Sequence, residues 1–229
     1  MGDFYKCENA CATSDCYTLK EILTTHNFET EYNESREYKV INTGTIGRFV
    51  SRWGKVPMKY LKDKYVYPYV IKEDFHKLFP KSYGEKPNKK KIIIKGLTLL
   101  DGTLDFDGVI VPGKSTLLIT ASTDEELKLL GAYINSRIAI FYIKQRYSSS
   151  SYNGGITFTK EMINSLPWFE LTDEENDKMI ALVNKIIELK NEDINANTLS
   201  YEQKIDDIFY HNFGFSAQEK QCIEKLFLK

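Results

Sequence analysis

The sequence predicts an α+β fold, in which a mixed or antiparallel twisted sheet is flanked by helices and followed by an all-helical C-terminal subdomain. Three observations lead to this prediction. β-Branched runs bounded by Gly, Pro or Asp extend to residue 122, helical periodicity replaces them afterwards, and no internal repeat interrupts the pattern. With 229 residues, of which 42% are hydrophobic, the chain can bury a core and form one or two domains.

The predicted strands are four apolar, β-branched runs of unequal length. They cover residues 38–44, 91–100, 108–112 and 115–122. Because the runs and the turns between them are irregular, they indicate an antiparallel or mixed sheet and not repeating βαβ units.

Apolar residues at helical spacing then predict one helix over about residues 124–146. Thr123 and Glu126 form the capping-box pattern that marks its start. This helix leads into "RYSSSSYNGGITF", residues 146–158, where serines and glycines are framed by basic and aromatic residues. The run is too short and too aromatic for a domain linker. It is interpreted as a functional loop, with a flexible surface loop as the alternative.

Beyond residue 168 the chain is expected to be helical to its end. Thr172 with Glu175 and Ser216 with Glu219 form two further capping boxes, and a helix is expected over about residues 201–212. We therefore predict a first domain over residues 1–168 and a helical C-terminal subdomain over residues 169–229.

The net charge of −1 conceals an asymmetry along the chain. Residues 1–165 contain 24 basic and 19 acidic residues, a net charge of +5, whereas residues 166–229 contain 7 and 13, a net charge of −6. A basic body indicates a polyanionic partner, and an acidic tail is also typical of an ordinary solvated helical surface. Charge alone favours neither interpretation.

Several classes of protein are disfavoured by the composition. No apolar run approaches the roughly 20 residues of a membrane span, and the N-terminus lacks a secretory pattern. The spacing of the four cysteines fits neither a disulfide framework nor a zinc site, which favours reduced thiols in a cytoplasmic protein. The histidines are isolated as well, so we expect no metal, no bound cofactor and no catalytic residue in this chain.

One segment matches a nucleotide-binding motif without its structural context. Residues 108–115, "GVIVPGKS", fit the pattern G-x-x-x-x-G-K-[ST] of phosphate-binding loops. Such a loop must open a helix, but β-branched residues fill this one and a strand is predicted after it. Nucleotide hydrolysis is therefore disfavoured, although Lys114 and Ser115 remain candidates for contacts to phosphate.

Basic residues with aromatic residues between them are the stronger signal. They occur in residues 48–64, in residues 86–95 and around Arg146, and Lys and Arg are the residues that neutralise phosphates. The alternative is three independent solvated surfaces. The candidate contact residues are Arg48, Arg52, Lys55, Lys91, Lys95, Lys114, Ser115, Arg146, Ser148 and Asn153.

Taken in order, these segments resemble a known family. The likeness covers nearly the whole chain and runs through residues 10–23, 40–54, 58–70, 91–98, 113–119, 133–167 and 201–219, among them "VINTGTIGRFVSRWG" (40–54) and "YEQKIDDIFYHNFGFSAQE" (201–219). No single stretch is specific, but their order and spacing together are. The chain resembles the TaqI-like C-terminal specificity region of adenine-specific DNA methyltransferases in type II restriction–modification systems.

The resemblance implies a target recognition domain that reads double-stranded DNA. It also implies a separate catalytic domain, in cis or in trans, that uses S-adenosylmethionine. The methyltransferase signatures F-x-G-x-G and [NDS]-P-P-[YF] do not occur in this sequence, so methyl transfer is not expected from this chain alone. Arg48, Arg52, Lys55 and Asn153 would then be the candidates for base contacts, and Arg146 and the serines those for phosphate contacts.

Two other classes of function remain open at this point. One is a protein-interaction module, whose helical tail docks a partner within a DNA-modification complex without reading bases. The other is a nucleotide hydrolase built on residues 108–115. DNA affinity that falls steeply with salt would favour recognition over the interaction module.

Overall fold

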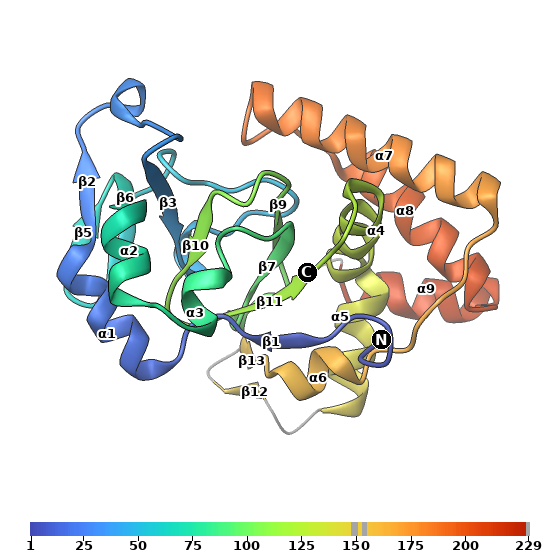
Figure 1. Cartoon of the computed structure of the whole chain (residues 1–229). Coiled ribbons are helices and arrows are strands. Elements are labelled where there is room, and N and C mark those ends of the chain that lie inside the picture. Colours follow the sequence, from blue (N-terminus) through green and yellow to red (C-terminus); the bar gives the residue numbers. More distant parts are fainter. Residues whose placement is uncertain (148–150, 153–154, 228–229) are drawn as a thin grey trace.

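Two four-stranded sheets form the body of the protein in the computed structural model (Figure 1). The structure describes residues 1–147, 151–152 and 155–227. The first sheet has the order β1-β11-β7-β9 with antiparallel neighbours. Its strands are β1 (Cys7–Asn9), β7 (Lys91–Lys95), β9 (Gly102–Asp105) and β11 (Thr116–Thr120).

The second sheet has the order β10-β3-β6-β2, and its β10–β3 pair is parallel. Its strands are β2 (Thr24–His26), β3 (Glu37–Ile41), β6 (Tyr67–Ile71) and β10 (Ile110–Pro112). Helices α1 (Thr13–Ile22), α2 (Lys72–Leu78) and α3 (Ser82–Glu85) lie beside this sheet (Figure 1). Tyr38, Val70 and Phe75 belong to the aromatic core beneath them.

Strand β7 shows why the two sheets pack together. Successive side chains of a strand point to opposite faces, and all three isoleucines of its "KIIIK" are buried. Ile92 and Ile94 join the core that also contains the C-terminal helices, whereas Ile93 contacts Ile41 and Ile110 of the second sheet. A run of β-branched residues that is buried on both faces is therefore required at this position.

Shorter elements fill the remaining edges. Strands β4 (Met58–Tyr60) and β5 (Asp63–Tyr65) form a two-stranded hairpin, and a small sheet has the order β12-β13-β8. Its strands are β8 (Leu97–Thr98), β12 (Ser151–Tyr152) and β13 (Gly155–Thr157). Two 3-10 turns are η1 (Glu29–Glu31) and η2 (Thr43–Thr45).

The single helix predicted over residues 124–146 is wrong, because the structure has two helices there. Helix α4 (Asp124–Ile134) starts at the predicted Thr123–Glu126 capping box, and Ser136 caps the start of α5 (Arg137–Arg146). At the break, the Asn135 side chain exchanges two hydrogen bonds of 2.9 Å with the backbone of Gly102. This contact with a strand distant in sequence holds Asn135 at the end of the first helix.

The C-terminal part is helical, as predicted. It contains α6 (Lys160–Asn164), α7 (Asp173–Glu192), α8 (Leu199–Asn212) and α9 (Ala217–Lys225). The capping boxes at Thr172 and Ser216 are confirmed. Helices α4 and α5 contact α7, α8 and α9 within one hydrophobic core, in which Tyr133, Val183 and Phe209 are fully buried (Figure 1). The acidic tail therefore packs on the body, and a domain boundary at residue 168 stays a prediction.

The α+β prediction is confirmed, with several sheets where one was expected. The strand predicted after residues 108–115 is confirmed, because β11 follows Gly113–Ser115 at the position where a phosphate-binding loop would need a helix. Within the described residues, no helix combines the length and the apolar character that crossing a membrane would require.

Candidate nucleic-acid interface

The candidate residues fall into three groups in the structure. One lysine is buried, a second group lines a groove beside α7, and a third lies on an exposed surface built from loops. Ser148 and Asn153 lie outside the described residues.

Lys91 is the buried member, and its predicted phosphate contact is wrong. Its side chain is 0% exposed, and its Nζ donates to the carboxylate of Asp105 and to the carbonyl oxygens of Pro87 and Lys89. Burial lowers the pKa of Lys91, and the neighbouring Asp105 carboxylate opposes this effect. The lysine therefore holds the turn after β9 from inside and does not reach solvent.

The second group surrounds the end of α7. The loop of residues 46–56 is anchored by buried Trp53, whose indole N–H donates to the carbonyl of Pro68 at 2.7 Å. This loop and α7 enclose a groove of about 250 Å³, and Lys55 lines a neighbouring pocket. The groove includes Arg48, Arg52, Lys95 and, from α7, Lys190, which sequence reasoning missed.

Two of the four cations of this groove, Arg48 and Lys95, already have acidic partners. Arg48 lies 2.6 Å from the Glu202 carboxylate and also donates to the carbonyl of Asn135, so it connects the loop to α8. Lys95 lies 2.5 Å from Asp101. These cations hold the protein together, which leaves them less available to phosphate than the sequence suggested.

The third group lies on what we call the loop surface, defined by residues 42–45, 58–65, 96–99, 113–115, 146–147, 151–152 and 155–157. Long-range hydrogen bonds join these segments. The carbonyl of Ser115 accepts from the Thr43 hydroxyl at 2.7 Å and from the Gly96 N–H at 3.0 Å. The Asn42 amide donates to the carbonyl of Lys59 at 2.5 Å, which attaches the β4–β5 hairpin. Four segments distant in sequence therefore form one surface.

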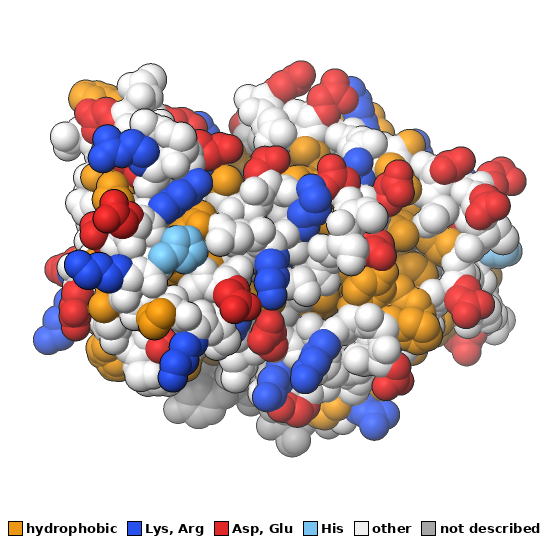
Figure 2. Space-filling view, in the orientation of Figure 1, with side chains coloured by type: hydrophobic (Ala, Val, Ile, Leu, Met, Phe, Trp, Pro, Cys, Tyr) orange, Lys and Arg blue, Asp and Glu red, His pale blue; other side chains and the backbone are white. Residues whose placement is uncertain are grey.

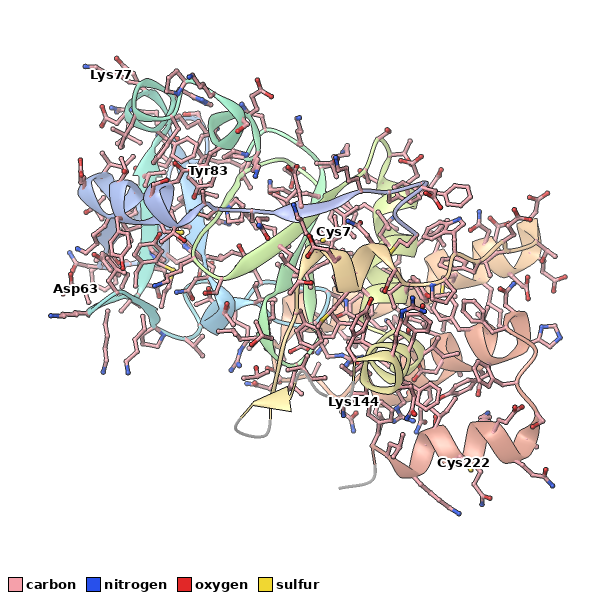
Figure 3. The ribbon with its side chains drawn as sticks, turned by 90° about the horizontal axis from the view of Figure 1, so that it is seen from below. Cys7, Asp63, Lys77, Tyr83, Lys144 and Cys222 are labelled. Carbon is pink, nitrogen blue, oxygen red and sulfur yellow. The ribbon has the colours of Figure 1, made fainter. Side chains whose placement is uncertain are left out.

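The β12–β13 hairpin extends this surface. Strand β13 pairs with β8, and the Phe158 N–H donates to the carbonyl of Gly96 at 2.9 Å. Arg146 lies exposed at the end of α5, within about 6 Å of the rings of Tyr142 and Tyr147. Figure 3 shows the hairpin projecting at the lower side of the molecule beside Lys144, with Asp63 of the β4–β5 hairpin toward its left end.

The cations of the loop surface lack acidic partners in the described part of the chain. No carboxylate oxygen lies within 4.0 Å of Lys59, Lys64, Lys114 or Arg146 there, and all four side chains are exposed. Lys59 and Lys64 are also directly opposite each other in the β4–β5 register. Sequence reasoning included them in a basic patch without selecting them, and only the strand register shows that they face the same side.

Backbone strain is concentrated on the same surface. Leu61, Thr98 and Ser115 have φ angles of +54°, +72° and +60°, in the left-handed region that is unfavourable for residues other than glycine. A fourth such residue in the described chain, Phe49, is buried in the loop beside the groove. Residues held in such conformations cluster at functional sites, where the surrounding structure compensates for the strain.

One face of the molecule does not show this charge pattern. On the face drawn in Figure 2, Lys and Arg side chains alternate with Asp and Glu side chains, so neither sign forms a continuous patch. Among the described residues, no group of three or more His, Cys, Asp or Glu side chains is placed to hold a metal ion. The loop surface is therefore the best candidate for binding a polyanion.

Comparison with known proteins shows a likeness of fold. No protein-family model and no curated protein matches the chain. The fold is similar to that of a solved structure of the Type IIL restriction-modification enzyme MmeI in complex with DNA, with a TM-score of 0.54 and 11% sequence identity. The likeness covers 93% of this chain and 33% of that one, so this chain spans about a third of the length of the MmeI chain. At this identity it concerns the fold alone.

Proposed function

We propose that this chain is a target recognition domain that binds double-stranded DNA and selects the sequence at which an adenine-N6 DNA methyltransferase acts. One observation carries the proposal: exposed cations without acidic partners among the described residues, the β12–β13 hairpin and strained loops share one surface. The resemblance to TaqI-like specificity regions supports the finer assignment. The fold shared with a restriction–modification enzyme solved with DNA supports the general one.

The charge arrangement fits a phosphate backbone. Like charges directly opposite in a hairpin are destabilising, and Lys59 and Lys64 are such a pair. Phosphates between the two ammonium groups would remove the repulsion and release counterions from the duplex. Lys114 and Arg146 are further exposed cations on the joined loops and would be available to contact other phosphates.

The groove beside α7 is the second part of the proposed interface. Arg52 has no acidic partner in the described structure, and Lys55 forms only an exposed ion pair of 3.2 Å with Glu29, which contributes little. Both side chains are free to contact base edges or phosphates. Arg48 is instead assigned to holding α8, because its guanidinium is already bound by protein groups.

Methyl transfer would belong to a separate catalytic domain, in the same polypeptide or in another, and S-adenosylmethionine would bind there. That domain needs the adenine out of the stack, because the reacting nitrogen is not accessible within the duplex. This chain would select the site and bind the DNA on either side of it. An endonuclease linked to the methyltransferase, or fused to it, would belong to the same restriction–modification system.

The test is binding of the chain to a randomised duplex library at two salt concentrations, followed by sequencing of the retained DNA. We expect retention that falls with salt and enrichment of several fixed bases. The informative variant is Lys59→Gln/Lys64→Gln, and Lys178→Gln/Lys204→Gln on α7 and α8 is the control with the same change of charge. Only the first should reduce retention. If the wild type retains no duplex at either salt, recognition is refuted and the protein-interaction module becomes the better hypothesis.

A further inference from the structure

The connection between β7 and β9 presents apolar side chains to solvent within the loop surface. Leu97 is 39% exposed and Leu99 is 61% exposed, and Thr98 between them is exposed as well. Large apolar side chains normally avoid such positions when they project together from a loop among cations. An apolar projection beside Lys114 and Ser115 therefore calls for a functional explanation.

The projection has a rigid base. The Lys95 N–H donates to the carbonyl of Asp101 at 2.9 Å, and the two side chains form an ion pair of 2.5 Å across the mouth of the loop. Leu100 is buried below it and is 4% exposed. Lys95 therefore serves to close the loop, and residues 97–99 extend from a fixed platform.

Both sides of the projection are held by the neighbouring segments of the loop surface. Leu97 and Thr98 pair with Thr157 and Ile156 of β13, which joins the loop to the serine-rich hairpin. On the other side the Gly96 N–H donates to the carbonyl of Ser115. Thr98 keeps a φ of +72°, a conformation that costs a β-branched residue free energy, so the projected shape is maintained against strain.

We propose that Leu97 and Leu99 form an apolar wedge that enters the DNA duplex at a base step and occupies the space left by an unstacked base. The inference rests on the proposed function, since it needs a duplex on the loop surface. Apolar side chains that enter between bases unstack them and kink the duplex, and burial of the side chain offsets part of that cost. The cations on both sides would hold the backbone while the leucines enter.

The experiment compares two 30-base-pair duplexes of the same sequence, one fully paired and one with a single central abasic site. In the abasic duplex a base is already missing, so a wedge binds without the cost of unstacking. We expect the wild-type chain to bind the abasic duplex about ten-fold more tightly, because insertion there avoids the cost of unstacking a base step. Leu97→Ser/Leu99→Ser should bring this ratio close to one.

The matched control is Leu199→Ser/Leu226→Ser, which removes two leucines of similar exposure, 49% and 47%, from the helical tail. It should keep the wild-type ratio. Circular dichroism establishes that each variant is folded, and if the wedge variant does not fold, the single change Leu99→Ser at the more exposed position replaces it.

The outcomes separate this inference from the function on which it rests. Absence of salt-sensitive binding to either duplex by the wild type would refute both. Salt-sensitive binding with equal affinity for the two duplexes would leave DNA binding intact and overturn the wedge. An equal loss of affinity for both duplexes in the wedge variant would assign the leucines to a surface contact, which also overturns insertion.

Discussion

Replacing Lys91 by methionine distinguishes a structural lysine from a DNA-binding lysine. Methionine keeps most of the length of the side chain but removes the charge and the donors that reach Asp105, Pro87 and Lys89. Because Lys91 is fully buried, we expect the variant to lose stability and to keep the salt dependence of DNA binding. This expectation is the reverse of the one that follows from its place in a lysine-rich run.

The loss in free energy of unfolding depends on the Asp105 carboxylate, which stays buried in the Lys91→Met variant. Removing one partner of a buried ion pair costs about 3–5 kcal/mol, because the other charge stays buried without compensation. Asp105 keeps hydrogen bonds of 3.0–3.2 Å from the N–H groups of Gly108, Val109 and Ile110, so we expect the lower value, about 3 kcal/mol. For a chain of this size, that lowers Tm by about 6–12 °C.

Two measurements on the same preparations test the prediction. Unfolding in urea gives the free energy of unfolding, and titration of one duplex at several salt concentrations gives the slope of log K against log salt. The control is Lys114→Met, an exposed lysine of the loop surface. It should unfold like the wild type and lower the magnitude of the slope by about one. A Lys91→Met chain with wild-type stability and a reduced slope would refute the reasoning.

Three further predictions concern an ion pair, a titrating carboxyl and a pair of like charges. Arg48→Met should lower the free energy of unfolding in urea by about 2 kcal/mol, because Glu202 on α8 loses its partner. Burial raises the pKa of Asp206 to about 7. Between pH about 4 and about 7 this carboxyl is therefore ionised in the unfolded chain but protonated in the folded one, so the free energy of unfolding falls as the pH rises. Asp206→Asn should remove most of that fall in Tm. Lys59→Gln/Lys64→Gln should raise stability by about 0.5 kcal/mol in low salt and reduce the salt slope by about two.

The first two of these predictions have a control variant of the same chemistry. Arg52→Met removes a groove cation without an acidic partner in the described structure and should leave stability unchanged. Asp207→Asn alters an exposed neighbour of Asp206 and should keep the wild-type dependence of Tm on pH. If Lys59→Gln/Lys64→Gln is less stable than the wild type in low salt, the two ammonium groups do not repel each other. If Arg48→Met and Arg52→Met lose the same stability, the ion pair between Arg48 and Glu202 does not explain the loss.

Local sequence determined the secondary structure well where the signal lies within a few residues. The capping boxes at Thr123, Thr172 and Ser216 each bring a hydroxyl and a carboxylate to the first turn of a helix, and all three are formed. The strands near residues 91–95 and 116–120 were predicted because their β-branched runs are continuous. These features depend on backbone geometry and nearest neighbours.

Tertiary structure decided the role of each basic residue. Lys91 and Lys90 are adjacent in one lysine-rich run, yet Lys91 is fully buried and Lys90 is 39% exposed. The break between α4 and α5 likewise depends on Gly102, more than thirty residues away from Asn135. No local pattern of residues encodes which strand will lie beneath a given side chain.

The candidate interface shows the same division. Composition indicated a basic body, and the "RYSSSSYNGGITF" segment indicated a loop with a function. Only the fold joins Lys59, Ser115 and Gly96 through hydrogen bonds between segments distant in sequence, and only the register sets Lys59 opposite Lys64. Local chemistry determined which residues can bind phosphate. Burial and long-range pairing, which depend on the whole chain, decided which of them are exposed together.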